Sequence, residues 1–220
     1  MPKQIDNEVL LNTQFDTNKY ELANNFNSQH CLTQETKLVI IGTITPPAGS
    51  GYFYTSPANK IYGYIDDFFN QKTLKTLKKQ LFDKNYNKNE TIFALKQELI
   101  SKNIAFLDIM KNAIRKNDSP YDNDILCYSL DIEGFSCIPK NAFVICNSRL
   151  AEQGYNQICE ILKIQPKYKY LSQRGSTKKE WLDTFANIFN KNKNEHQILE
   201  QLKLVKKRHI IVWYVFSFKT

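Results

Sequence analysis

The chain has 220 residues, of which 42% are hydrophobic and 13% aromatic, which supports one substantial core and excludes a disordered chain. Its longest apolar run, residues 210–218, is about half the length of a membrane-spanning helix. The N-terminal residues lack the charged-then-apolar layout of a secretion signal. We therefore expect a cytoplasmic protein with no membrane segment.

The chain is basic. Lysine and arginine number 30 against 22 acidic residues, which gives a formal net charge of +8 and an isoelectric point near 9.1. Such a balance favours polyanionic partners such as nucleic acid. A lysine- and asparagine-rich composition inherited from an AT-biased genome explains the same excess, and composition alone does not separate the two explanations.

The cysteines do not form a recognisable framework. There are five, an odd number, and none belongs to a Cys-x-x-Cys pair. This usage fits buried thiols in a reducing compartment. No spacing matches that of a structural zinc site, so we expect no metal and no other cofactor. The cysteines are Cys31, Cys127, Cys137, Cys146 and Cys159.

One short apolar run organises the chain. Residues 38–41 are Leu-Val-Ile-Ile and are followed by Gly42, which predicts a strand buried on both faces in the middle of a parallel sheet. Pro46 and Pro47 then end the strand, because they have no N–H to donate to a ladder. The loop continues with small residues and the aromatics 52–54. Ligands bind at the carboxyl ends of parallel strands, so this loop is the predicted site.

Patterns along the rest of the chain predict an α/β protein. We expect a three-layer α/β/α sandwich with a central, mainly parallel four-stranded sheet and an extra C-terminal strand. Residues 1–36 are polar and mixed, and predict only a short helix at 8–11. The other predicted strands are 103–109, 141–146, 168–171 and 210–218, and the main predicted helices are 60–69, 71–82, 92–101, 178–190 and 195–204.

A row of lysines runs along the predicted helix 71–82. Lys72, Lys75 and Lys79 recur at the spacing of one helix face. Such a row could face phosphate, but a charged row on a helix is ordinarily its solvated face. We interpret it as solvent-facing.

The segment 42–62 resembles the first motif of the uracil-DNA glycosylase superfamily. It reads Gly-Thr-x-x-Pro, then Tyr-x-Tyr-x-x-Pro-x-Asn-x-Ile-Tyr. The pattern is nearest that of the branch with the mismatch-specific and hypoxanthine-DNA glycosylases, in which Phe-Trp stands where this chain has Ile61 and Tyr62. The resemblance implies a glycosylase-like domain over 37–206, preceded by a lead-in at 1–36 and followed by a strand extension at 207–220.

The resemblance implies hydrolysis of an N-glycosidic bond after the nucleotide is flipped out of DNA. Asn59 is then the candidate for positioning the attacking water, with the N-cap of the next helix as the alternative. Thr45 stands where stronger members of the superfamily place Asp or Asn for that water. A threonine hydroxyl can orient water, but it is a poor base near neutral pH.

Four residues are candidates for binding the base. The backbone at Gly42 and Thr43 could hold a base carbonyl, and Tyr54 could offer a stacking face or instead pack under the loop. Asp108, at the end of the second predicted strand, could accept a hydrogen bond from a base N–H, or cap a helix or hold the neighbouring loop. We expect Tyr54 and Asn59 to face a shared cavity.

The candidates for contacting the DNA backbone follow the third and fourth predicted strands. They are Arg149, Ser172, Arg174 and Ser176. The segment 171–177 lacks the proline and histidine that are usual in the second motif of the superfamily. Ser176 or Thr177 could instead cap the helix that follows, with Glu180 completing a capping box around Thr177. We interpret Asn147, after the third strand, as the cap of its helix.

Three functions compete at this point. The first is a monomeric DNA glycosylase that acts on double-stranded or single-stranded DNA, with the excised base open. The second is a DNA-binding protein of the same fold that has lost catalysis, which Thr45 and the missing histidine favour. The third is an α/β enzyme whose aromatic loop binds a nucleoside or sugar.

Overall fold

The computed structural model describes residues 2–25, 30–45, 52–117, 119, 121–172 and 175–190. Contacts between residues divide the chain into two units, Met1–Leu182 and Asp183–Thr220. In the second unit the described residues, 183–190, are helical. The predicted helix at 195–204 and the predicted strand at 210–218 lie outside the described residues. The division of the chain expected from the motif therefore stays a prediction.

The first unit contains the predicted parallel sheet. Its order is β4-β3-β7-β8, and every neighbouring pair is parallel. The central strand β3 has all five residues buried, as its continuous apolar run predicted. The bounds are β3 Leu38–Gly42, β4 Ile104–Asp108, β7 Phe143–Cys146 and β8 Tyr168–Tyr170. All four predicted core strands are confirmed.

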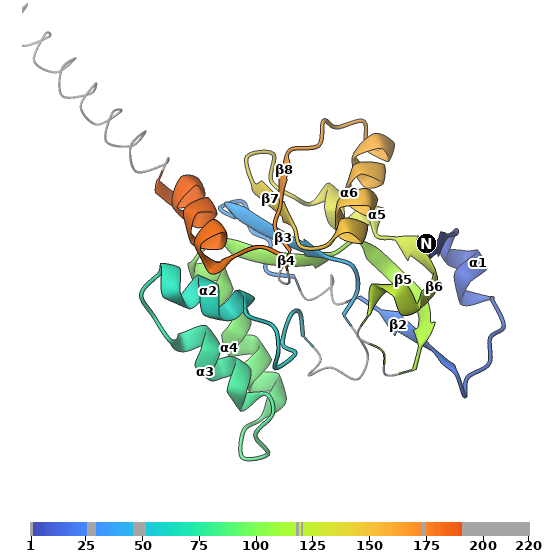
Figure 1. The fold of residues 1–220 in the computed structure, drawn as a ribbon, viewed down its shortest axis with the longest axis horizontal. Coiled ribbons are helices and arrows are strands. Elements are labelled where there is room, and N and C mark those ends of the chain that lie inside the picture. The colour runs from blue at the N-terminus through green and yellow to red at the C-terminus, as the bar shows by residue number, and fades with distance from the viewer. Residues whose placement is uncertain are drawn as a thin grey trace, which may run out of the picture. The chain divides into compact units, whose positions relative to one another are not determined.

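Helices cover both faces of this sheet. In Figure 1, α2, α3 and α4 lie on one side of the strands, and α5 and α6 lie on the other. The predicted α/β/α sandwich is therefore confirmed. The bounds are α2 Ile61–Phe68, α3 Thr73–Gln80, α4 Lys88–Ser101, α5 Ile132–Ser136 and α6 Arg149–Ile161. Among the described residues, no helix is long and apolar enough to cross a membrane.

Alternation along the strands divides the core between the two faces. Val39 and Ile41 belong to one buried cluster together with Ile158 of α6. On β4, the Phe106 ring lies edge-on to Tyr62 of α2, with ring centroids 5.5 Å apart. The same ring meets Tyr54 of the aromatic loop at 4.9 Å. The loop after β3 is thus anchored on the neighbouring strand.

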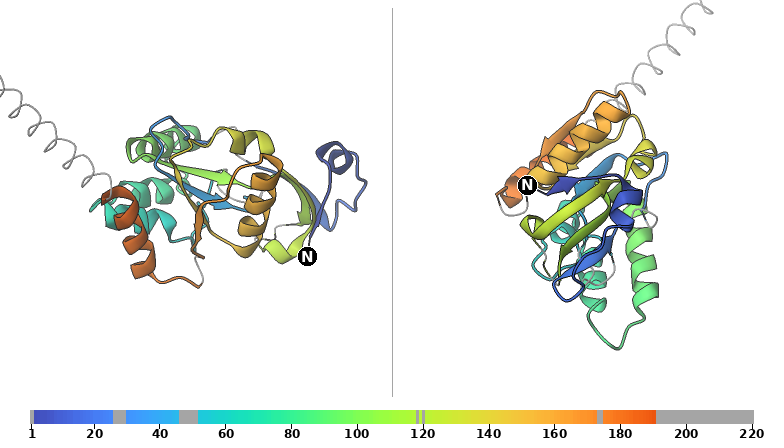
Figure 2. Two further views of the ribbon diagram at one scale, coloured as in Figure 1. Left: turned by 90° about the horizontal axis from the view of Figure 1, so that it is seen from above. Right: turned by 90° about the vertical axis from the view of Figure 1, so that its right-hand side faces the viewer.

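A second sheet was not predicted. Its order is β1-β6-β5-β2, with β1 parallel to β6 and the other pairs antiparallel. Figure 2 shows the blue N-terminal strands alongside the yellow-green ones. The predicted lead-in therefore contains two strands as well as the short helix α1 (Asn7–Leu11). The bounds are β1 Lys3–Gln4, β2 Tyr20–Asn24, β5 Met110–Lys116 and β6 Ile125–Leu130.

The second sheet escaped prediction because its strands are short or mix apolar with polar residues. Strand β5 reads Met-Lys-Asn-Ala-Ile-Arg-Lys, which matches neither a continuous apolar run nor strict alternation. Only Ile109 separates β5 from β4. The chain therefore passes from one sheet to the other within one residue.

A buried carboxylate joins α2 to α3. Asp66, near the end of α2, is fully buried, and its two oxygens accept hydrogen bonds from the backbone nitrogens of Leu74 (3.1 Å) and Lys75 (2.8 Å). These N–H groups belong to the first turn of α3, where no intrahelical acceptor exists. The residue at the N-cap itself, Lys72, makes no side-chain capping bond. Asp66 therefore fixes the angle between the two helices.

We expect Asp66→Ala to lower the free energy of unfolding by roughly 2 kcal/mol, because two buried N–H groups lose their acceptor. Asp66→Asn keeps one acceptor and should lose less. Urea unfolding followed by circular dichroism measures both. Equal stability of wild type and Asp66→Ala would contradict the capping role.

Candidate active site

Polar groups converge where the parallel strands end. Gly42, the last residue of β3, pairs in register with Asp108, the last residue of β4. A Cβ atom on Gly42 would lie 2.5 Å from the Tyr54 hydroxyl oxygen and 2.8 Å from Asp108 Oδ1. Both distances are shorter than a carbon–oxygen contact allows. Only glycine therefore lets the phenol and the carboxyl group approach the strand end together.

Asp108 is held by the loop residue Thr45. Its Oδ2 accepts hydrogen bonds from the Thr45 backbone nitrogen (2.9 Å) and from the Thr45 hydroxyl (3.0 Å). The side chain is 2% exposed. Burial raises the pKa of Asp108 to about 7, helped by the nearby Asp122 carboxylate and opposed by the Thr45 hydrogen bonds and by Arg115. Near neutral pH this carboxyl group can therefore either donate or accept a hydrogen bond.

The Tyr54 hydroxyl lies at the same ends of β3 and β4 as Asp108. Its φ angle of 52° lies in the left-handed region, which is strained for a residue with a bulky side chain. Its ring lies edge-on against Phe106, which fits the alternative that Tyr54 packs under the loop. The hydroxyl is buried, and no hydrogen bond of normal geometry from another described residue reaches it. Burial and the nearby Asp108 keep the pKa of Tyr54 well above its usual range, so the hydroxyl remains a donor.

Asn147 completes the group. Its side-chain amide interacts with the Tyr54 hydroxyl and so opposes the rise in the pKa of Tyr54, yet its buried oxygen has no hydrogen-bond partner of normal geometry among the described residues. The interpretation of Asn147 as the cap of α6 is wrong, because Ser148 caps that helix by accepting a bond from the Ala151 nitrogen at 3.1 Å. Asn147 directly follows the buried strand β7, which is the signal that could have assigned it to the site.

A second polar layer lies beside these residues. Thr43 donates its hydroxyl hydrogen bond to Asp122 at 2.7 Å, in the 3₁₀ turn Asp122–Asp124 that precedes β6. Arg115 of β5 is 1% exposed, and its Nε has no hydrogen-bond partner among the described residues. Burial lowers the pKa of Arg115, and nearby carboxylates, Asp122 first, oppose this. The guanidinium keeps its charge and balances the carboxylates.

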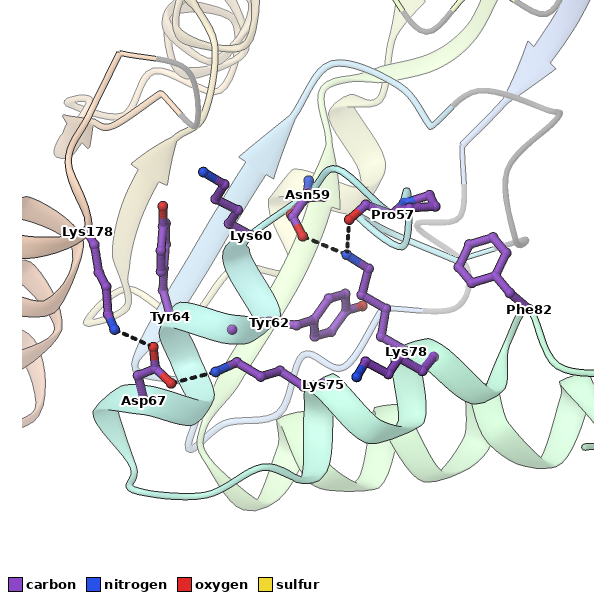
Figure 3. Close-up of a pocket in the computed structure, with 12 residues that line it drawn as sticks. Pro57, Asn59, Lys60, Tyr62, Tyr64, Asp67, Lys75, Lys78, Phe82 and Lys178 are labelled. Atoms are coloured by element: carbon purple, nitrogen blue, oxygen red, sulfur yellow. Dashed lines mark hydrogen bonds and ion pairs between the residues drawn. The ribbon is translucent and has the colours of Figure 1, made fainter.

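Asn59 lies in a different place from Tyr54. Its Oδ1 accepts a hydrogen bond from the Ile61 nitrogen at the start of α2 (3.0 Å), as the capping alternative expected. Asn59 lines a pocket of about 720 Å³ beside α2 and α3, and Tyr54 does not line it (Figure 3). The structure therefore brings together Gly42, Thr43, Thr45, Tyr54 and Asp108, but not Asn59.

The predicted contacts with the DNA backbone lie at or just after the end of β8. Arg149 is exposed, pairs with Glu152 at 2.7 Å and lies over the Tyr170 ring. Ser172 closes a turn by accepting a bond from the Gly175 nitrogen at 2.8 Å. Ser176 follows in the same turn, and Arg174 lies outside the described residues.

The capping alternative at 177–180 matches the structure. Thr177 Oγ1 accepts a hydrogen bond from the Glu180 nitrogen at 3.2 Å, and Glu180 Oε2 accepts one from the Thr177 nitrogen at 2.6 Å. This reciprocal pair is a capping box, and it starts the helix at residue 178.

The raised pKa of Asp108 makes a prediction about stability. The carboxyl group ionises near pH 3.8 in the unfolded chain and near pH 7 in the folded one. Between these values the folded state binds more protons, so this group makes stability fall as pH rises. We expect the unfolding free energy of wild type, relative to Asp108→Asn, to fall by roughly 2.5 kcal/mol between pH 5 and pH 8. Urea unfolding at both pH values measures this, and a parallel pH dependence of the two proteins would contradict it.

Comparison with known proteins supports the fold. No family model and no curated protein matches the sequence. Among solved structures, the fold resembles the solution NMR structure of a protein from Methanosarcina acetivorans that is provisionally assigned as a uracil DNA glycosylase. The chains are 17% identical, the TM-score is 0.50, and the match covers 76% of this chain and 99% of the other. This chain therefore has a uracil-DNA-glycosylase-like fold, as its first motif indicated.

Proposed function

We propose that the protein is a DNA glycosylase-like hydrolase that binds a base flipped out of DNA and hydrolyses its N-glycosidic bond. The observation that carries this proposal is the pair of buried polar atoms beside Asp108 at the strand ends, Tyr54 Oη and Asn147 Oδ1, for which the described residues supply no hydrogen-bond partner of normal geometry. An unsatisfied buried polar group costs roughly 1–3 kcal/mol. A ligand that supplies the missing partners accounts for both groups at once.

The hydrogen-bonding capacity of the site favours a particular base edge. The Tyr54 hydroxyl can donate to a carbonyl oxygen, and the Asn147 oxygen can accept from an N–H. A carbonyl next to an N–H is the lactam edge shared by uracil, thymine, hypoxanthine and guanine. Adenine and cytosine offer an amino group and a bare ring nitrogen there. We infer that the excised base carries a lactam.

The same groups can assist bond cleavage. When the glycosidic bond breaks, negative charge develops on the departing base, and a donor already aimed at its carbonyl stabilises that charge. Sugar C1′ gains oxocarbenium-like character and needs a positioned water. We propose Thr45, beside Asp108, for orienting that water. The motif implies the same role for Asn59, but its side chain caps α2 and lines the separate pocket beside α2 and α3. Gly42 and Thr43 shape the wall that the base meets.

A panel of duplex and single-stranded oligonucleotides tests the reaction. Each carries one altered base, and alkaline strand cleavage reports abasic sites. We expect release from an oligonucleotide with uracil, hypoxanthine or mismatched thymine, and none from the matched unmodified strands. Failure with every lactam base would contradict the proposal.

Tyr54→Phe separates ligand binding from folding. We expect base release to fall roughly 100-fold, because a donor to the developing anion is lost. The unfolding free energy should stay level or rise, because the described residues give the removed hydroxyl no hydrogen-bond partner of normal geometry. Single-turnover kinetics and urea unfolding measure the two effects.

Tyr52→Phe is the matched control. The Tyr52 hydroxyl already has a partner, Cys31 Sγ, at 3.0 Å. This variant should lose roughly 1 kcal/mol of stability and keep its base release. Equal rates for Tyr54→Phe and wild type would remove Tyr54 from the site.

A DNA-binding protein without catalysis is the second candidate. The hydroxyl of Thr45 in place of a carboxylate favours it, and so does the absence of a histidine from 171–177. Such a protein would bind an oligonucleotide with a lactam base more tightly than the unmodified one and leave no abasic site.

A further inference from the structure

A basic pocket lies beside α2 and α3, apart from the strand-end site. It has a volume of about 720 Å³, within the range of ligand pockets, and it is lined by residues from 57–82 together with Lys178. Five lysines and one acidic residue, Asp67, line it. The row of lysines on α3, which the sequence analysis interpreted as a solvated face, supplies Lys79 and Lys75 (Figure 3) to this lining.

Two of the lysines share one carboxylate, which balances one of their two charges. The Asp67 carboxylate of α2 pairs with the ammonium groups of Lys75 and Lys178, each at an N–O distance of 2.6 Å. These hydrogen-bonded pairs lower the pKa of Asp67. Figure 3 shows the carboxylate between the two ammonium groups. Lys78 donates instead to the backbone oxygens of Asn59 (2.6 Å) and Pro57 (3.3 Å). This lysine therefore holds the start of α2 against α3.

No carboxylate among the described residues balances the charge of the other three lysines. In the described part of the chain, no carboxylate pairs with Lys60 or Lys79, and Lys78 contacts only neutral oxygens. Burial lowers the pKa of Lys78, which shows that its ammonium group is partly removed from water. The ammonium groups around the pocket repel one another, and an anion bound in the pocket reduces this repulsion.

The walls also offer flat apolar surfaces. Tyr64 of α2 and Phe82, just after α3, line the pocket with their rings, and Phe82 is 52% exposed. Aromatic faces beside lysines suit a ligand that carries both a phosphate and a planar ring. A nucleotide has this combination.

We propose that this pocket binds a nucleotide through its phosphate, at Lys60 and Lys79, with the base against Phe82 or Tyr64. The source we favour is the DNA strand itself, one or more nucleotides away from the flipped base. The reason is position: Lys60 follows Tyr54 by six residues, so the two sites flank one short loop. This choice of ligand rests on the proposed function, but binding of an unmodified strand needs no catalysis.

The double variant Lys60→Gln/Lys79→Gln tests the pocket. Its matched control, Lys140→Gln/Lys167→Gln, removes the same charge just before β7 and β8, at the amino ends of the strands. Fluorescence anisotropy measures binding of an unmodified oligothymidylate at several salt concentrations. We expect the pocket variant to lose roughly ten-fold in affinity at about 50 mM salt, and its log–log salt slope to flatten by roughly 0.7 for each lost phosphate contact. The control should stay close to wild type.

Each outcome decides the proposal. Equal loss in both variants, or no loss in the pocket variant, overturns it even if wild type releases bases. A selective loss in the pocket variant supports it even if no base is released. Thymidine monophosphate and inorganic phosphate, titrated as competitors, identify the source. If thymidine monophosphate competes at low concentration, the ligand of the pocket is a free nucleotide. If inorganic phosphate competes as strongly as thymidine monophosphate, the proposed role of the aromatic rings is overturned.

Discussion

The register between β3 and β4 is the constraint on which the candidate site depends. It sets Gly42 opposite Asp108, and the missing Cβ of Gly42 leaves room for the Tyr54 hydroxyl and the Asp108 carboxyl group at one strand end. A slip of one residue would turn every side chain of β3 to the opposite face. Close packing of particular side chains, such as Val39 and Ile41 in the cluster with Ile158, opposes such a slip. The position of the polar groups thus follows from the apolar packing behind them.

The energetic balance explains how a costly site persists. Two buried polar atoms without a hydrogen-bond partner of normal geometry cost roughly 1–3 kcal/mol each, and the left-handed Tyr54 adds roughly 1–3 kcal/mol. Each fully buried large apolar side chain contributes roughly 1.5–3 kcal/mol. The four apolar residues 38–41 of β3, all fully buried, contribute free energy of the same order as this cost. Asp108 follows the same logic, since two hydrogen bonds from Thr45 hold it in place although burial raises its pKa to about 7.

The strand-end site and the basic pocket have complementary chemistry. The first presents a phenol, an amide and a carboxyl group with little net charge, which suits the edge of a base. The second presents ammonium groups and aromatic faces, which suit a nucleotide with its phosphate. The segment from Tyr54 to Lys60 connects them, and Asp66 fixes the helix pair that forms the pocket. The net charge of +8 fits a polyanionic partner for both.

The sequence by itself determined the parallel sheet, the helices α2, α3 and α4 on one of its faces and the loop at its carboxyl edge, because continuous apolar runs and helical spacing are local signals. It also identified Tyr54 and Asp108. Only the tertiary structure decided that Asn59 lies apart from Tyr54 and that Asn147 faces it, because side-chain direction depends on which neighbour caps each helix. The second sheet also needed the fold, since β5 has a polar–apolar mixture that becomes a strand only through pairing with β2 and β6.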